Sequence, residues 1–382
     1  MKGPVGFIVN PLAGIGGRLG FKGSDGAYGL RALAMGAKLV SPERARVFLE
    51  SLRPGVRLLV PPGLMGFDVV RGTGHEVYAE VVRCVPARVW PTTAFDTRRC
   101  ASQMAGMGVK LLVFVGGDGT ARDIVDSVNR RIPVLGVPAG VKVYSSVFAV
   151  NPRAAARIVE RFLEGLTPLV EREVLDIDED EFRRGRLTVK LYGYLLVPQD
   201  EMLVESGKTV FTAAEDEEVE AIASYVVETM EPDTLYILGP GRTVEAIARK
   251  LGIEKTPLGV DAVYNGKLVG KDLDERGLLE LLEKYPKAKI ILSPIGGQGF
   301  ILGRGNQQIS PEVIRRVGPK NIVIVATKAK LATFKTLKVD TGDEEVDRML
   351  QGYTRVITGY YRETVVKVEG PNNTEKQSFN SI

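Results

Sequence analysis

The chain has 382 residues, a length at which a single hydrophobic core has stopped growing, so two domains are expected and one small module is excluded. Its composition, 44% hydrophobic and 26% charged, is typical of an ordinary globular protein. The 51 Lys and Arg residues against 47 Asp and Glu leave a net charge of +4, spread along the chain. This balance argues against nucleic-acid or membrane-surface binding and leaves small anionic ligands open.

Histidine and cysteine are scarce, which restricts the chemistry open to this chain. His75 is the only histidine, so Ser-His-Asp triads and His-rich metal sites are nearly excluded, and acid–base chemistry falls to carboxylates, Lys or Tyr. We expect His75 itself to be a loop or surface residue. Cys84 and Cys100 form no Cys-x-x-Cys pair, and we expect reduced thiols in a reducing compartment. Because no apolar run reaches the length of a membrane span or a signal peptide, we expect a cytoplasmic protein.

The first 165 residues alternate short apolar runs with amphipathic segments. The apolar runs predict strands at 5–9, 57–60, 80–85, 111–115 and 133–137, and three- and four-residue spacings predict helices at 42–52, 93–107 and 120–130. Strand–helix alternation predicts a parallel, doubly wound sheet. A strong helix at 153–164 ends at Gly165, so we place the end of an N-terminal α/β domain, residues 1–165, there.

From residue 166 the pattern changes, and we expect a second domain over 166–370. It begins with a β-rich part, 166–214, that contains a hairpin, and it ends with short strands at 335–370. Between them, 215–334 predicts a second α/β unit, which opens with four acids at the start of a helix. The strands expected in this unit are 235–238, 259–263, 289–292 and 322–326, and its further helices 244–251 and 274–284. The polar tail, 371–382, is expected to be disordered.

The strongest motif is a glycine turn between an apolar strand and a helix. The sequence there reads Val-Phe-Val followed by Gly116, Gly117, Asp118, Gly119 and Thr120. Ligands bind beyond the carboxyl ends of parallel strands, and glycines there let backbone N–H groups approach phosphate at a helix N-terminus. We expect Asp118 at the mouth of such a site, where its carboxylate accepts the proton of an attacking hydroxyl. A helix-capping turn explains Asp118 or Thr120 but not three flanking glycines.

A second glycine-rich segment follows the first predicted strand directly. It begins Asn-Pro-Leu-Ala-Gly at 10–14 and continues with further glycines to 29. Such a loop permits close approach of a nucleotide polyphosphate, although neither a Walker A nor a Rossmann pattern aligns with it, and a flexible loop without a ligand is the alternative. Asp25 either approaches a ligand hydroxyl or is a turn residue. The residues that we expect to hold the donor are Asn10, Gly14, Gly16, Gly17, Lys22, Asp25, Gly116, Gly117, Gly119 and Thr120.

Together the two loops resemble those of a known superfamily, that of NAD kinases, diacylglycerol kinases, sphingosine kinases and phosphofructokinases. The closer resemblance is to the archaeal and bacterial ATP-NAD kinase-like family, related to the AcoX proteins. It extends along the chain through the segments 20–26, 116–123, 133–143, 191–198, 296–300 and 303–311. The resemblance implies transfer of the terminal phosphoryl group of ATP, or of polyphosphate, to the 2′-hydroxyl of the adenosine ribose of NAD. It also implies that Asp118 is the base.

Recognition of the acceptor differs from the pattern usual in this superfamily. Typical NAD kinases carry an Asn-acid pair that binds the substrate ribose, whereas no Asn in this chain precedes an acid, and 230–330 reads as α/β rather than mainly β. The second α/β unit has glycine loops of its own, and the one at 238–243 resembles the sugar-phosphate loop of ribose-5-phosphate isomerase-like proteins. Turn chemistry at strand ends is the alternative. The residues that we expect to bind the acceptor are Gly239, Gly241, Arg242, Thr243, Gly297, Gln298, Arg304 and Asn306.

The sequence therefore predicts a small-molecule kinase that uses Mg²⁺ with ATP and takes NAD as its acceptor substrate. Magnesium is inferred from polyphosphate chemistry, because no ligand motif for a metal is present. The alternatives are a kinase of another small alcohol, such as a nucleoside, polyol or hydroxy-ketone, and a nucleotide- or sugar-phosphate-binding regulator without turnover. We expect small-molecule nucleotides as partners, no nucleic acid or membrane, and assembly into a homo-oligomer.

Overall fold

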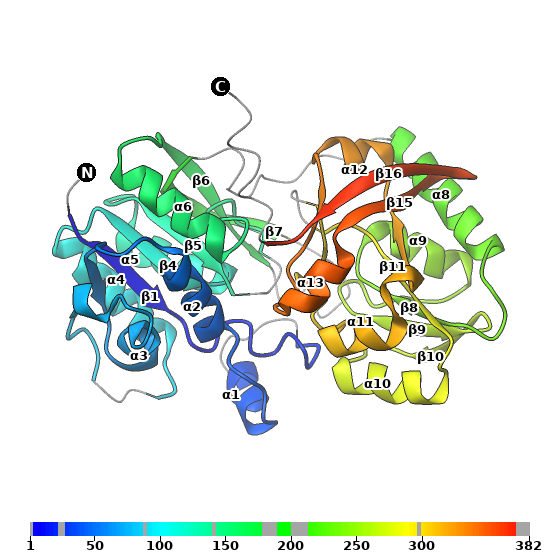
Figure 1. The fold of residues 1–382 in the computed structure, drawn as a ribbon, viewed down its shortest axis with the longest axis horizontal. Coiled ribbons are helices and arrows are strands. Elements are labelled where there is room, and N and C mark those ends of the chain that lie inside the picture. The colour runs from blue at the N-terminus through cyan, green and yellow to red at the C-terminus, as the bar shows by residue number, and fades with distance from the viewer. Residues whose placement is uncertain are drawn as a thin grey trace. The chain divides into compact units, whose positions relative to one another are not determined.

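The computed structural model describes residues 3–21, 27–86, 90–139, 143–177, 189–199, 213–295 and 299–371, coloured from blue to red along the chain in Figure 1. Packing divides the chain into two compact units. The first unit comprises Met1–Gly16, Gly23–Arg183 and Leu187–Gly207, and the second comprises Gly17–Lys22, Arg184–Arg186 and Lys208–Ile382. Each unit has a sheet and a hydrophobic core of its own.

The first unit contains a five-stranded parallel sheet, as the strand–helix alternation predicts. Its strands are β1 (Val5–Val9), β2 (Leu58–Val60), β3 (Ala79–Val81), β4 (Leu111–Gly116) and β5 (Val134–Pro138). Their order is β3-β2-β1-β4-β5, and β1 pairs with β4 in register from Val5 opposite Leu111 to Val9 opposite Val115. The chain therefore winds away in both directions from β1 and β4, which makes their carboxyl ends the topological switch point of the sheet.

Helices cover both faces of this sheet. The helices are α1 (Ala27–Ala34), α2 (Ser41–Ser51), α3 (Phe67–Val70), α4 (Ala94–Gly106), α5 (Asp118–Val128) and α6 (Pro152–Leu163), with 3₁₀ turns at Gly63–Met65 and Glu76–Tyr78. Successive residues of β1 point to opposite faces. Gly6 faces Met104 of α4, whereas the Phe7 ring stacks on Phe48 of α2 with centroids 5.4 Å apart. The sheet is therefore doubly wound, as expected.

A two-stranded antiparallel hairpin, β6 (Leu169–Ile177) and β7 (Val189–Pro198), belongs to the first unit. The buried side chains of Val174, Leu195 and Val197 join the core of that unit, and the strands lie against α5 and β5. The first compact unit therefore continues past residue 165, where we expect the N-terminal α/β domain to end. The sequence changes from an α/β to a β-rich pattern at this point, but the β-rich hairpin still packs into the core of the first unit.

The second unit has a nine-stranded sheet in the order β10-β9-β8-β11-β13-β15-β16-β14-β12. Its strands are β8 (Leu235–Leu238), β9 (Asp261–Tyr264), β10 (Lys267–Gly270), β11 (Ala288–Leu292), β12 (Phe300–Leu302), β13 (Ile322–Val325), β14 (Leu337–Val339), β15 (Gly352–Gly359) and β16 (Arg362–Glu369). Its helices are α8 (Ala213–Glu228), α9 (Arg242–Lys250), α10 (Glu275–Lys284), α11 (Pro311–Val317), α12 (Lys328–Ala332) and α13 (Glu344–Leu350), with a 3₁₀ turn at Pro319–Asn321. Strands β8, β11, β13 and β15 run parallel, which confirms a second α/β unit within a β-rich part of the chain.

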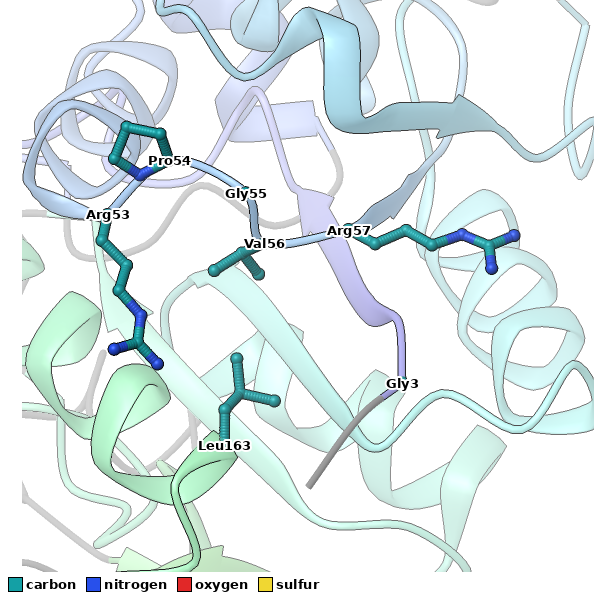
Figure 2. A pocket seen from close by; sticks show the side chains of 7 residues that line it. All are labelled: Gly3, Arg53, Pro54, Gly55, Val56, Arg57 and Leu163. Atoms are coloured by element: carbon teal, nitrogen blue, oxygen red, sulfur yellow. The ribbon is translucent and has the colours of Figure 1, made fainter.

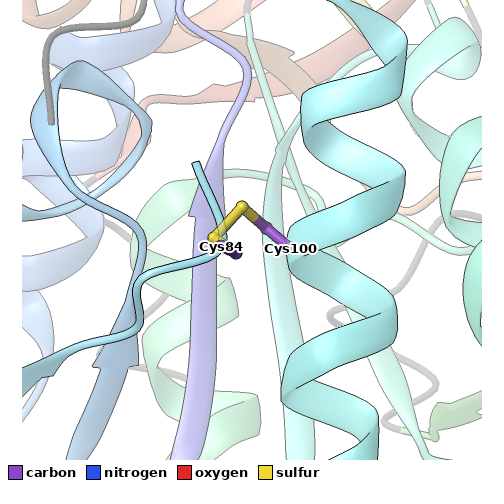
Figure 3. The surroundings of a disulfide bond; sticks show 2 residues. All are labelled: Cys84 and Cys100. Atoms are coloured by element: carbon purple, nitrogen blue, oxygen red, sulfur yellow. A yellow bond between two sulfur atoms is a disulfide. The ribbon is translucent and has the colours of Figure 1, made fainter. Parts of the chain in front are cut away.

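The expectation of two reduced thiols is wrong. Cys84, just after β3, and Cys100 of α4 form a disulfide (Figure 3) rather than two reduced thiols, because the end of β3 lies against α4. Closing a loop of this length contributes about 3 kcal/mol to stability in the chain-entropy model. His75 lies in a loop, as expected, but it is buried there (3% exposed), and its Nε2 lies 3.1 Å from the Leu52 carbonyl oxygen. Within the part of the chain that the structure describes, no helix is long and apolar enough to cross a membrane.

Candidate active site at the carboxyl edge of the first sheet

The two glycine-rich loops meet at the switch point, although more than 100 residues separate them in sequence. The Asn10 N–H donates to the Val115 carbonyl at 3.0 Å, and Asn10 Nδ2 donates to Thr120 Oγ1 at 3.0 Å. Asn10 Oδ1 accepts the Leu12 N–H at 3.2 Å. Because β1 and β4 are parallel neighbours, their following loops leave the same edge of the sheet, and Asn10 joins them there.

Two glycines allow this close approach. Gly14 has φ of +78°, and a Cβ there would lie 2.3 Å from the Ala139 carbonyl oxygen. A Cβ on Gly116 would lie 2.4 Å from Thr120 Oγ1. Gly117, which begins the turn into α5, has an extended backbone with φ of −125°, a conformation open to any residue. Gly14 and Gly116 therefore hold the two loops together, whereas the backbone angle gives no reason for glycine at 117.

Asp118 is the first residue of α5, and its half-buried carboxylate accepts three hydrogen bonds. Oδ2 accepts the Tyr144 N–H at 2.8 Å, while Oδ1 accepts the Ser145 N–H at 2.9 Å and the Ser145 hydroxyl at 2.6 Å. Burial raises the pKa of Asp118 to about 6, with a smaller increase from Asp176, although the bonds from Ser145 and Tyr144 act in the opposite direction. The result is a carboxylate that titrates close to neutral pH.

Tyr144 and Ser145 were not among the residues expected from sequence. They follow β5, the neighbour of β4, so they emerge at the same edge as Asp118. Ser145 also ties this edge to the hairpin, because its Oγ accepts the Leu175 N–H at 2.9 Å. Their position in the sequence could have indicated them. Because β5 is the parallel neighbour of β4, polar residues that follow β5 lie near Asp118, which follows β4.

The remaining expected donor residues divide between the two units. Gly16 ends the first segment of unit one, and Gly17 begins the short segment 17–22 that packs with the second unit. In that segment the Arg18 carbonyl accepts the Glu275 N–H at 3.1 Å, and the guanidinium lies 3.8 Å from the Glu275 carboxylate. Lys22 and Asp25 lie outside the described residues. The part of the donor loop that the first unit itself holds is therefore 10–16.

The expected acceptor residues all belong to the second unit. Gly239 and Gly241 follow β8, and Gly241, with φ of +123°, precedes α9. Thr243 is buried in the first turn of α9, and the Arg242 guanidinium pairs with the carboxylate of Asp216. These residues form a loop between a strand and a helix, as the sequence predicts.

Arg304 and Asn306 lie in a separate buried loop after β12. The Arg304 guanidinium is 4% exposed and lies 4.3 Å from the centre of the Phe300 ring. Asn306 is fully buried, and its Nδ2 donates to the Ile301 carbonyl at 2.8 Å. Gly297 and Gln298 lie outside the described residues. Burial and packing give Arg304 and Asn306 a role in holding their own loop.

The described residues contain no group of three or more His, Cys, Asp or Glu side chains that could hold a metal ion. At the switch point the carboxylate of Asp118 is already committed to three N–H and O–H donors. These side chains therefore do not fit a metal centre built by the protein alone. Magnesium that accompanies ATP is held mainly by phosphate oxygens.

A cavity of about 630 Å³ opens at the opposite edge of the first sheet, before β1 and β2 (Figure 2). Its lining residues are Gly3, Arg53, Pro54, Gly55, Val56, Arg57 and Leu163. Both cations are already paired, Arg53 with Glu164 and Arg57 with Glu80. Because ligands of parallel α/β sheets bind at the carboxyl edge, the switch point and not this cavity is the candidate active site.

Comparison with known families gives two matches along the chain. The ATP-NAD kinase N-terminal domain matches residues 5–167, which include both loops of the switch point, and the ATP-NAD kinase C-terminal domain matches residues 232–368. No curated protein and no solved structure matches the chain. The two family matches cover most of the chain and indicate an ATP-dependent phosphotransferase of the NAD kinase type. The chain belongs to the NAD kinase-like family.

Proposed function

We propose that the protein transfers the terminal phosphoryl group of ATP, or of polyphosphate, to the 2′-hydroxyl of the adenosine ribose of NAD, which gives NADP. The main support is the position of Asp118 at the switch point, beside the loop that contains Asn10 and at the start of α5. The family matches support the reaction class. They leave the acceptor to be tested.

Asp118 has the capacity that a general base needs. A carboxylate offers about four lone-pair sites, and the donors of Tyr144 and Ser145 occupy three of them. One site is left for the hydroxyl of the acceptor. As the hydroxyl oxygen bonds to the γ-phosphorus and the bond to the ADP oxygen breaks, the hydroxyl proton passes to Asp118. A pKa of about 6 lets this group be ionised at neutral pH and still accept the proton.

The donor phosphates are assigned to the backbone around the same edge. Helix α5 contributes the partial positive charge of its first turn, and the tight turns at Gly14 and Gly116 keep Cβ atoms out of the loops. Magnesium would enter with the nucleotide and offset the charge of its phosphates. No step of the proposed reaction is assigned to a protein-bound metal.

The acceptor is assigned to the loops of the second unit, including the turn at Gly239–Thr243. One observation favours a different acceptor: the chain has no Asn followed by an acid, the pair that typical NAD kinases use for the ribose. Phosphorylation of another small alcohol, such as a nucleoside, polyol or hydroxy-ketone, is therefore the second candidate.

An acceptor panel tests the proposal. Purified protein with Mg²⁺ and either ATP or polyphosphate is given NAD, NADH, nucleosides, polyols and short hydroxy-ketones, and phosphorylated products are identified by mass spectrometry. NADP as the product with the highest kcat/KM is the expected result. A higher kcat/KM with another alcohol would replace NAD as the acceptor, and no transfer to any acceptor would leave a binding protein without turnover.

A further inference from the structure

A half-buried lysine in the second unit has no role in the proposed reaction. Lys330 lies on α12, which follows β13, and its Nζ donates to Ser293 Oγ at 3.3 Å. Ser293 follows β11, the parallel neighbour of β13, and is 1% exposed. The ammonium therefore lies at the carboxyl edge of the second sheet, the edge at which parallel sheets bind ligands.

The ammonium lacks a close counter-ion in the part of the chain that the structure describes. The acid that acts on its charge is Glu215 of α8, whose carboxylate accepts the Thr327 hydroxyl at 2.9 Å. Among the described residues, the hydrogen-bond partner of the Lys330 ammonium is the neutral Ser293 hydroxyl. Burial lowers the pKa of Lys330 to about 8, although Glu215 partly opposes this. A neutral hydroxyl compensates an ammonium much less than an anion does.

A second positive feature lies against the same serine. Gly241, with φ of +123°, is the residue before α9, and a Cβ there would lie 3.4 Å from Ser293 Cβ. Helix α9 is nine residues long, and no side chain caps its first turn. The start of a helix carries a partial positive charge, and Ser293 lies beside both this turn and the Lys330 ammonium. An anion bound to the Lys330 ammonium and to the first turn of α9 would offset the positive charge of both.

We propose that Lys330, Ser293 and the backbone of the first turn of α9 bind a phosphate or pyrophosphate group of a small-molecule ligand. A phosphate group fits because it accepts from an ammonium, a hydroxyl and backbone N–H groups at once. The identity of the whole ligand, the pyrophosphate-containing acceptor, rests on the proposed function. Binding of the anion itself does not depend on it.

Inorganic pyrophosphate is the probe, and calorimetry on the whole chain counts the ions bound. The donor site can also take pyrophosphate, so the measured quantity is the difference between variants. Lys330→Met is expected to bind one pyrophosphate per chain fewer than wild type, or to bind it at least about tenfold more weakly. Lys328→Met, on the same helix and with an exposed side chain, is the matched control and is expected to bind as wild type does.

Thermal unfolding shows whether Lys330→Met is folded, and Lys330→Gln provides a second replacement that removes the charge. Equal pyrophosphate binding by wild type and a folded Lys330 variant would overturn the site, and so would an equal loss in Lys328→Met. The number of pyrophosphate ions bound per chain tests the site even if no acceptor is phosphorylated. Conversely, NADP formation with unchanged counts would sustain the proposed function and remove this site.

Discussion

The carboxyl edges of the two sheets have the same architecture and opposite electrostatics. Each edge gathers loops that follow parallel strands, and each has glycines before a helix: Gly116 and Gly117 before α5, Gly239 and Gly241 before α9. Burial shifts a titratable group at each edge toward its neutral form. It raises the pKa of Asp118 to about 6 and lowers that of Lys330 to about 8. The first edge can accept a proton, whereas the second presents an ammonium whose hydrogen-bond partner among the described residues is a neutral hydroxyl.

The two groups also differ in how completely the protein surrounds them. Asp118 accepts three hydrogen bonds from Tyr144 and Ser145, so its position is fixed without a ligand. Among the described residues, the ammonium of Lys330 has one hydrogen-bond partner, the Ser293 hydroxyl. A catalytic base works best when the protein fixes its position in advance, as it does for Asp118. A binding site for an anion needs a cation that can still accept a partner, as Lys330 can. The predictions below separate these two roles.

The largest expected effect is that of Asp118→Asn, which should lower turnover by about 10²–10⁴-fold because the amide cannot accept the proton. Its effect on folding is the balance of a gain and a cost. The pKa of Asp118 is about 6 in the fold, above its ordinary value of 3.8, so the free energy of unfolding falls as pH rises from 3.8 to about 6, and Asn removes that cost. The NH₂ group that Asn introduces, however, cannot accept the hydrogen bond that Tyr144 or Ser145 donates to the carboxylate. This lost bond costs about 1–3 kcal/mol of stability.

Steady-state kinetics, calorimetry with ATP and thermal unfolding measure these quantities together. Asp126→Asn is the matched control, because Asp126 lies on the same helix and bonds to the exposed Tyr192 hydroxyl at 2.9 Å. Turnover of Asp118→Asn within threefold of wild type would remove Asp118 from the catalytic role and leave it as the anchor of Tyr144 and Ser145.

Gly14→Ala should come next in size. The methyl group would lie 2.3 Å from the Ala139 carbonyl oxygen in a backbone with positive φ, so the loop must move. We expect a loss of roughly 2–4 kcal/mol of stability and at least tenfold weaker ATP binding. Gly36→Ala is the control, because Gly36 has φ of +79° and no atom within 4 Å of an added Cβ. Equal effects of the two changes would show that the approach to Ala139 is unimportant for the donor.

Ser145→Ala tests whether the surroundings of Asp118 set its proton affinity. The Ser145 hydroxyl lowers the pKa of Asp118, so its removal should raise that pKa further. Since the base works when ionised, kcat/KM falls as pH falls through this pKa, and the acidic limb should move to higher pH by about one unit. At pH 6 the loss is then about fivefold, and at pH 8.5 it is small.

The pH profile of kcat/KM is the measurement, with Ser146→Ala as its control. The Ser146 hydroxyl donates to Glu173 at 2.6 Å and is not bonded to Asp118. A uniform loss at all pH values in Ser145→Ala would mean that the hydroxyl only holds the hairpin in place through Leu175.

Sequence patterns predicted the long elements well and the short ones poorly. Strands β1 and β8 match the predicted ranges 5–9 and 235–238, because continuous apolar runs bounded by polar residues define buried strands. Strand β12 and helix α12 have three and five residues, too few to show a period, and were missed. The hairpin was assigned to the wrong unit, since a strand pattern does not show which core receives its buried face.

The candidate site was predictable where it depends on local chemistry. Asn10 and the glycine turn at 116–120 were expected in one site because loops after parallel strands share an edge. The contacts of Ser145 with Asp118 and of Ser293 with Lys330 join residues 27 and 37 positions apart, and no motif marks them. Such pairs arise only when the sheet places one loop against another. The disulfide between Cys84 and Cys100 was missed for the same reason.

Arg242→Ala should have the smallest effect and tests the second edge directly. The Arg242 guanidinium is 44% exposed and pairs with Asp216, so solvent and a carboxylate already offset its charge. We expect the KM for the acceptor to rise by no more than about threefold and the KM for ATP to stay constant. In the same assay, Lys330→Met should raise the acceptor KM at least tenfold. The opposite ranking, with Arg242→Ala the more damaging change, would place the anion at the exposed start of α9, and Lys330 would then be a structural lysine that the second edge tolerates without a ligand.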